Sequence, residues 1–160
     1  METRLINVGI ADLKVGREND LLRTILGSCV GICLHDKVNF VGGLSHILLP
    51  ESGDGSASLP KKYANTAIPM LIETMVEYGA NRKNLTAKLV GGAQVLFFAK
   101  ASIISEIGVN NIKKVKEILS DLNINVIAED LGGDFGRTIE FSVNSGIVRI
   151  KSMRRPEKVI

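Results

Sequence analysis

Apolar and polar residues follow two different periods along the chain, and the changes of period predict where strands and helices lie. Short segments that are apolar, β-branched or loosely alternating are typical of strands. They occur at residues 8–15, 30–34, 85–90, 124–129, 138–143 and 147–151. Polar residues 16–20 predict a turn, from which a loop is expected to lead to Thr24.

Helical periodicity occurs twice. The first predicted helix has Asn65 or Thr66 as its N-cap and ends near Gly79, and the second begins at Asn110 or Asn111. Each carries an apolar stripe that should face a core. The stripe residues are Ile68, Leu71, Ile72, Met75 and Val76 in the first helix, and Ile112, Val115, Ile118, Leu119 and Leu122 in the second.

The order of these elements predicts the fold class. Strands outnumber helices without strict alternation, and no internal repeat is present. We therefore expect residues 1–160 to form one α/β (α+β) domain, a sandwich of mainly antiparallel or mixed sheet covered by helices. A chain of 160 residues is long enough to bury roughly two thirds of its unfolded surface. Residues 50–62, rich in Ser, Gly and Pro, predict an exposed loop, and residues 91–94 predict a close-packed turn into an apolar segment at 95–98.

The amino-acid composition indicates which classes of binding partner are not expected. A net charge of +3 is mildly basic, but the cations are dispersed and aromatic residues make up only 4%, so nucleic-acid binding is not expected. No apolar run approaches the roughly 20 residues needed to span a bilayer, so no membrane insertion is expected. The N-terminus has no apolar run of signal-peptide length, which predicts a cytoplasmic protein with reduced cysteines.

Cys29 is the candidate nucleophile, because it directly follows Gly27 and Ser28 and precedes an apolar run. The second cysteine, Cys33, lies four residues later on the same expected strand, where the α-carbons are about 13 Å apart. That separation is too long for a disulfide and disfavours a shared metal. A zinc site built from both cysteines and both histidines also lacks paired CxxC motifs. No metal or cofactor is expected.

A predicted hairpin connects Cys29 with the histidine it would need. If its turn is centred between Lys37 and Val38, Cys29 lies directly opposite His46, with Cβ atoms about 4.5–5.5 Å apart. A bulge at residues 42–43 would shift this register by one residue.

Such a pair would perform acyl transfer. The imidazole of His46 would take the thiol proton, Cys29 would attack an amide or an ester, and backbone N–H groups around Gly27 and Ser28 would receive the oxyanion. The spacing does not distinguish an amide from an ester. The alternative is an inert core cysteine beside a satisfied core histidine.

Residues 24–36 closely resemble the CheD family, the chemoreceptor glutamine deamidases of bacterial and archaeal chemotaxis. Four further segments match successive motifs of that family in order: 43–50, 62–67, 88–93 and 129–137. The resemblance implies that Cys29 is the nucleophile, that His46 is its base and that Thr24 orients His46. It implies hydrolysis of specific receptor glutamines to glutamate with release of ammonia, and in related members hydrolysis of glutamyl methyl esters.

The resemblance also implies partners. Methyl-accepting chemotaxis receptors would be substrates, and the phosphatase CheC would bind the same protein as a regulator. Two other hypotheses remain open. One is a binding module for CheC or a receptor helix with weak or absent catalysis. The other is redox sensing through a sulfenic acid on Cys29.

Overall fold

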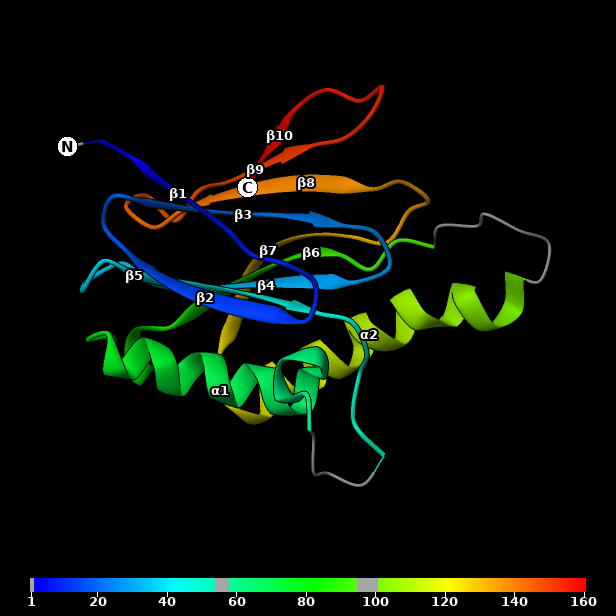
Figure 1. Cartoon of the computed structure of the whole chain (residues 1–160), viewed down its shortest axis with the longest axis horizontal. Coiled ribbons are helices and arrows are strands. Elements are labelled where there is room, and N and C mark those ends of the chain that lie inside the picture. The colour runs from blue at the N-terminus through cyan, green and yellow to red at the C-terminus, as the bar shows by residue number, and fades with distance from the viewer. Residues whose placement is uncertain (1, 54–57, 95–100) are drawn as a thin grey trace.

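Two five-stranded sheets lie face to face, and two helices cover the outer side of one of them (Figure 1). The structure is a computed structural model that describes residues 2–53, 58–94 and 101–160. Sheet A contains, in spatial order, β1 (Arg4–Asn7), β3 (Asp20–Leu26), β8 (Arg137–Ser142), β9 (Val148–Lys151) and β10 (Lys158–Val159). Sheet B contains β2 (Asp12–Arg17), β5 (Val41–Ile47), β4 (Val30–Asp36), β6 (Thr86–Gly91) and β7 (Asn125–Leu131).

The remaining elements are α1 (Ala64–Glu77), α2 (Ala101–Asp121) and two short 3-10 turns, η1 (Pro60–Lys62) and η2 (Arg82–Asn84). Both sheets are mixed, because β1 pairs with β3 and β6 with β7 in parallel while the other named pairs are antiparallel. The predicted α+β sandwich with helices covering a sheet is therefore confirmed. Among the described residues, no helix combines the length and apolar character needed to cross a bilayer.

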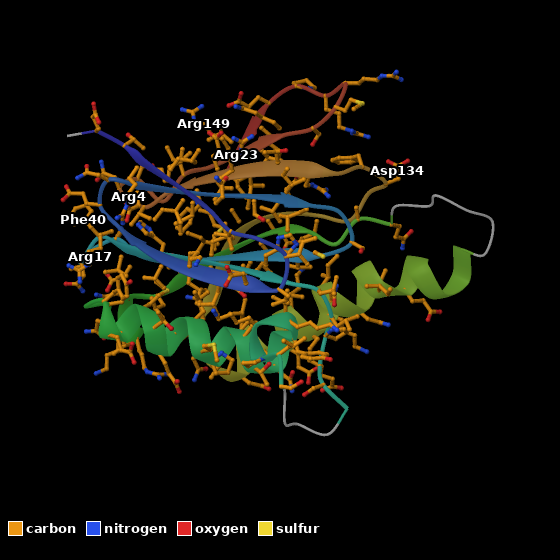
Figure 2. The ribbon with its side chains drawn as sticks, in the orientation of Figure 1. Arg4, Arg17, Arg23, Phe40, Asp134 and Arg149 are labelled. Atoms are coloured by element: carbon orange, nitrogen blue, oxygen red, sulfur yellow. The ribbon has the colours of Figure 1, made fainter. Side chains whose placement is uncertain are left out.

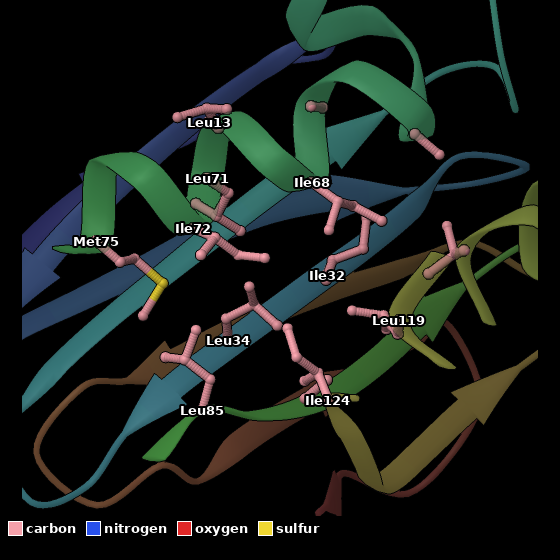
Figure 3. Close-up of a cluster of buried hydrophobic side chains, with 14 of the residues drawn as sticks. Leu13, Ile32, Leu34, Ile68, Leu71, Ile72, Met75, Leu85, Leu119 and Ile124 are labelled. Atoms are coloured by element: carbon pink, nitrogen blue, oxygen red, sulfur yellow. The ribbon is translucent and has the colours of Figure 1, made fainter. Parts of the chain in front are cut away.

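One core lies between the helices and sheet B (Figure 3). The side chains of α1 pack there against Ile32 and Leu34 of β4, whose neighbours along the strand face the opposite way. Burial of each such aliphatic side chain contributes about 1.5–3 kcal/mol. The predicted stripes are confirmed at Ile68, Leu71, Ile72, Met75, Val115 and Leu119. They are wrong at Val76 and Leu122, which are 41% and 39% exposed near the ends of their helices.

A second core lies between the two sheets, and it contains Cys29 and Cys33. The opposite face of sheet A carries charged side chains. Arg23, Glu140 and Arg149 are consecutive cross-strand neighbours there, and Figure 2 shows Arg23 and Arg149 in this part of the molecule. Neighbouring opposite charges stabilise adjacent strands modestly. Sheet A thus faces a core on one side only, whereas sheet B is covered on both.

The helix boundaries differ from the predicted ones. Tyr63, with extended backbone, is the N-cap of α1, two or three residues before the expected cap. Gly79 follows the last turn with a φ of +105°, as a C-terminal glycine should. The second helix begins at Ala101, so Asn110 and Asn111 lie inside it instead of capping it. The apolar segment predicted at 95–98 lies outside the described residues.

The N-terminal prediction was wrong in two places. Only residues 12–15 of the strand expected at 8–15 are in a strand, β2, because the chain turns between β1 and β2 at Ala11, whose φ is +55°. The loop expected before Thr24 is strand β3. Its inward-facing positions alternate between polar and apolar residues, which hides the period of two. These buried positions are Asp20, Leu22, Thr24 and Leu26.

Candidate active site

The candidate site lies where the chain crosses from sheet A to sheet B. Residues 27–29 make this crossing between β3 and β4, and Cys29 is its last residue. Thr24 lies near the end of β3 in sheet A, and His46 lies near the end of β5 in sheet B. All three predicted catalytic residues are buried, with exposed fractions of 7% for Cys29, 4% for Thr24 and 1% for His46.

The predicted register of the hairpin was wrong by two residues. His46 pairs with Gly31, so Cys29 is its diagonal neighbour instead of its direct partner. Diagonal neighbours lie about 7–8 Å apart, which long side chains still span. Cys29 precedes β4, and both side chains face the space between the sheets, since Cys29 belongs to the core there and His46 is hydrogen-bonded to Thr24 of sheet A. Gly31 allows the side chain of Leu26 to pack against this strand, since a Cβ there would lie 2.9 Å from Leu26 Cδ1.

The reason for the shift is a turn longer than the symmetric two-residue turn. Asp36 pairs with Val41, which leaves residues 37–40 in the turn. The buried Asp36 carboxylate accepts hydrogen bonds from the backbone N–H groups of Val38 and Asn39, and Phe40 has a φ of +53°. Asp36 also accepts from the N–H of Asn81, so a distant part of the chain fixes this turn.

A short hydrogen bond joins the two sheets at Thr24 and His46. The distance between Thr24 Oγ1 and His46 Nδ1 is 2.7 Å, and Thr24 Oγ1 also lies 2.7 Å from the backbone oxygen of Val8. A hydroxyl has one proton, and the Val8 carbonyl can only accept. Thr24 therefore donates to Val8 and accepts from His46, which fixes the imidazole as the Nδ1–H tautomer with a lone pair on Nε2.

The other ring nitrogen of His46 is available for chemistry. Nε2 is buried and has no hydrogen-bond partner among the described residues. Burial lowers the pKa of His46 to about 4, so the ring is neutral near pH 7. A neutral imidazole with an unshared lone pair is the form that a general base requires.

Cys29 is held as a thiol. Burial raises its pKa, while its own backbone N–H lowers it by a smaller amount. Near neutral pH both Cys29 and His46 are therefore uncharged in the free protein. The arrangement fits transfer of the thiol proton to His46 as the sulfur attacks.

The turn that carries Cys29 is fixed by the end of β6, a contribution that sequence reasoning missed. The backbone oxygen of Cys29 accepts from Gly92 N–H at 2.8 Å, and that of Gly27 accepts from Ala93 N–H at 2.9 Å. A Cβ on Gly91 would lie 2.3 Å from the Cys29 oxygen, so only glycine permits this approach. The paired glycines at 91–92 were the available signal.

An open pocket of about 430 Å³ gives access to the histidine side of the site. Thr24 and His46 are in its wall, and the side chains of Ile10 and Ile25 beside them are 65% and 67% exposed. Its complete lining is Asn7, Val8, Gly9, Ile10, Arg23, Thr24, Ile25 and His46. The pocket is thus largely apolar with one cation.

Cys33 and His35 lie away from this site. Cys33 is 1% exposed, and burial raises its pKa to about 12. His35 Nε2 lies 2.7 Å from the backbone oxygen of Val143, to which it donates. These residues therefore have structural surroundings, in agreement with the prediction that Cys33 belongs to the core.

Comparisons with known proteins give the same family as the motifs. Residues 48–152 match the family described as CheD chemotactic sensory transduction. A protein of Clostridium botulinum named probable chemoreceptor glutamine deamidase CheD is 46% identical over 155 residues, covering 96% of both chains. A protein of the same name from Desulfitobacterium hafniense is 41% identical over 159 residues, covering 99% of both. The resemblance predicted from the sequence is confirmed, and the chain belongs to the CheD family.

Proposed function

We propose that this protein hydrolyses glutamine side chains of chemoreceptors to glutamate, with Cys29 as nucleophile and His46 as general base. The names of its relatives supply the reaction and the substrate class. The observation that carries the residue assignment is the Thr24–His46 hydrogen bond, which leaves the Nε2 lone pair of a neutral histidine free on the face shared with Cys29.

The first half of the reaction forms a thioester. His46 Nε2 takes the proton of the Cys29 thiol as Sγ bonds to the side-chain carbonyl carbon of glutamine. The oxygen becomes an oxyanion that backbone N–H groups at Ser28 and Cys29 would stabilise. As the intermediate collapses, the C–N bond breaks, and the imidazolium returns its proton to the leaving nitrogen, which departs as ammonia.

The second half releases glutamate. His46 removes a proton from water, the resulting hydroxide attacks the thioester carbonyl, and the C–S bond breaks as the imidazolium gives its proton to the leaving sulfur and restores the thiol. A glutamyl methyl ester would give the same thioester with methanol as leaving group, so ester hydrolysis belongs to the same proposal. Thr24 keeps Nδ1 protonated through both halves and supports the imidazolium that forms transiently.

The proposal includes a cellular location and a regulatory partner. We place the protein in the cytoplasm, where the modified segments of receptors would be accessible, and we keep CheC as the regulatory partner implied by the family. The competing function is a binding module for CheC or a receptor helix. The burial of Cys29 and its raised pKa are the observations that favour it.

The two cysteines provide the test. Purified receptor is incubated with the protein, and receptor peptides are searched by mass spectrometry for conversion of Gln to Glu. We expect Cys29→Ala to abolish the conversion, because no other group forms the thioester, and Cys33→Ala, a matched change in the same core, to retain it. Conversion at the wild-type rate by folded Cys29→Ala would refute the mechanism, and a wild-type protein that converts no receptor glutamine would favour a binding role.

A further inference from the structure

The side chain of Asn111 lies near the site, in the middle of α2, and is fully buried. Its Nδ2 group donates to the backbone oxygen of Ser28 at 3.2 Å and to that of Leu48 at 3.0 Å. Ser28 precedes Cys29, and Leu48 lies two residues after His46. One amide group therefore joins the segment of the candidate nucleophile to the segment of the candidate base.

The orientation of this amide follows from its two partners. Both are carbonyl oxygens, which accept only, so the nitrogen must face them. As a result Oδ1 is buried without a hydrogen-bond partner among the described residues. An unpaired buried carbonyl is unfavourable for folding. The fold retains this unfavourable group at a position that reaches both carbonyls.

The hydrogen bond to Ser28 also determines where the next N–H points. The chain has no cis peptide bond among the described residues, and across a trans peptide the carbonyl and the following N–H point in opposite directions. With its oxygen held by Asn111, the Ser28 carbonyl faces α2, so the N–H of Cys29 faces away from α2. The carbonyls of Gly27 and Cys29 are held in the same manner by Ala93 and Gly92.

We propose that Asn111 is a positioning residue that aims the Cys29 backbone N–H toward the thiol and the developing oxyanion. This inference deepens the proposed function and rests on it. The N–H of Cys29 already lies close enough to its own sulfur to lower the thiol pKa, which is the placement that the proposal requires. A hole of this kind acts only if its donors are fixed before the reaction.

The test separates aiming from simple packing. We compare Asn111→Ala and Asn111→Ser with Asn110→Ala, a matched change at the exposed neighbouring position of the same helix. Loss of one oxyanion donor typically lowers kcat by about 10²–10³-fold, and misdirection should lower it about 10- to 100-fold, with KM nearly unchanged. We expect Asn110→Ala to match the wild type.

A second readout does not depend on deamidation. The rate of Cys29 alkylation by iodoacetamide is followed against pH in the Cys33→Ala background, and we expect its midpoint to move to higher pH in the Asn111 variants. Circular dichroism identifies the variants that fold. A folded Asn111 variant with wild-type kcat and an unmoved midpoint would overturn the inference. If the wild type did not deamidate receptors, the proposed function would fail, and the alkylation midpoint would still decide the role of Asn111.

Discussion

The hairpin formed by β4 and β5 carries a cysteine and a histidine toward each of its ends, and only one of these pairs has the features of an active site. Cys29 and His46 lie toward the open end, and Cys33 and His35 lie toward the turn. Both histidines stand opposite a glycine and both have a lowered pKa caused mainly by burial. The two ends of the hairpin therefore have the same residue types, and both histidines are neutral near pH 7.

The difference lies in which ring nitrogen is left over. His35 donates through Nε2 to the backbone oxygen of Val143, and its Nδ1 packs against Gly146, where a Cβ would lie 2.7 Å away. His46 donates through Nδ1 to a hydroxyl and leaves Nε2 unpaired. A histidine is therefore a candidate base when one ring nitrogen donates to a partner and the fold leaves the lone pair of the other nitrogen unpaired.

The largest difference between the two ends of the hairpin is expected when each histidine is replaced in turn. We expect His46→Gln to lower kcat for deamidation by about 10²–10⁴-fold, the usual contribution of a general base. His35→Gln should stay within about threefold of wild type, because glutamine can still donate to the Val143 carbonyl. Rates are measured by ammonia release from receptor. Equal losses in the two variants would show that the ends do not differ as described.

Acid pH should reveal the buried neutral state of His46. Its folded pKa of about 4 lies below the ordinary value of 6.5, so the unfolded chain binds a proton first as the pH falls. The free energy of unfolding should therefore decrease by about 2 kcal/mol from about pH 7 to about pH 5 through this group. Urea unfolding at both pH values measures the loss. His46→Gln should remove most of it, whereas His35→Gln should remove less because His35 is only half-buried.

A smaller effect is expected when Thr24 is replaced, because His46 then loses the acceptor for its Nδ1–H and can carry its proton on Nε2, as His35 does. Thr24→Val keeps the shape but removes the acceptor for Nδ1–H, so the Nε2–H tautomer becomes accessible and kcat should fall about 10- to 100-fold. Thr24→Ser keeps the hydroxyl and should stay within about threefold. Steady-state kinetics provide the check. A valine variant as active as the serine variant would argue against the tautomer assignment.

The sequence identified Cys29 and His46 as candidates, but it did not predict the geometry that joins them. The pairing of Cys29 with His46 was predicted from a symmetric turn, whereas Asp36 builds a longer one with help from Asn81. No local pattern contains a contact formed across 45 residues. Both side chains nevertheless face the space between the sheets.

Strand β3 and the role of Asn111 were also not predicted, because their buried polar side chains are bound by residues distant in the sequence. Strand β3 was missed because Asp20 and Thr24 occupy inward positions that usually hold apolar side chains. Asp20 is satisfied there by Arg4, and Thr24 by Val8 and His46. Asn111 was taken for a helix cap, since asparagine favours caps and its buried partners lie far away in the sequence. The core-facing residues of α1 were predictable because one helical face decides them.

The division of the site between two sheets has a consequence for the growing chain. Thr24, Cys29 and His46 precede the helices and later strands in the sequence, so they are synthesised before those segments. Strand β3, however, is paired with β8, and the turn of Cys29 is held by residues 91–93 and by α2. A chain that lacks these later segments therefore carries Thr24, Cys29 and His46 without the contacts that arrange them, and we expect its Cys29 thiol to react as an ordinary cysteine.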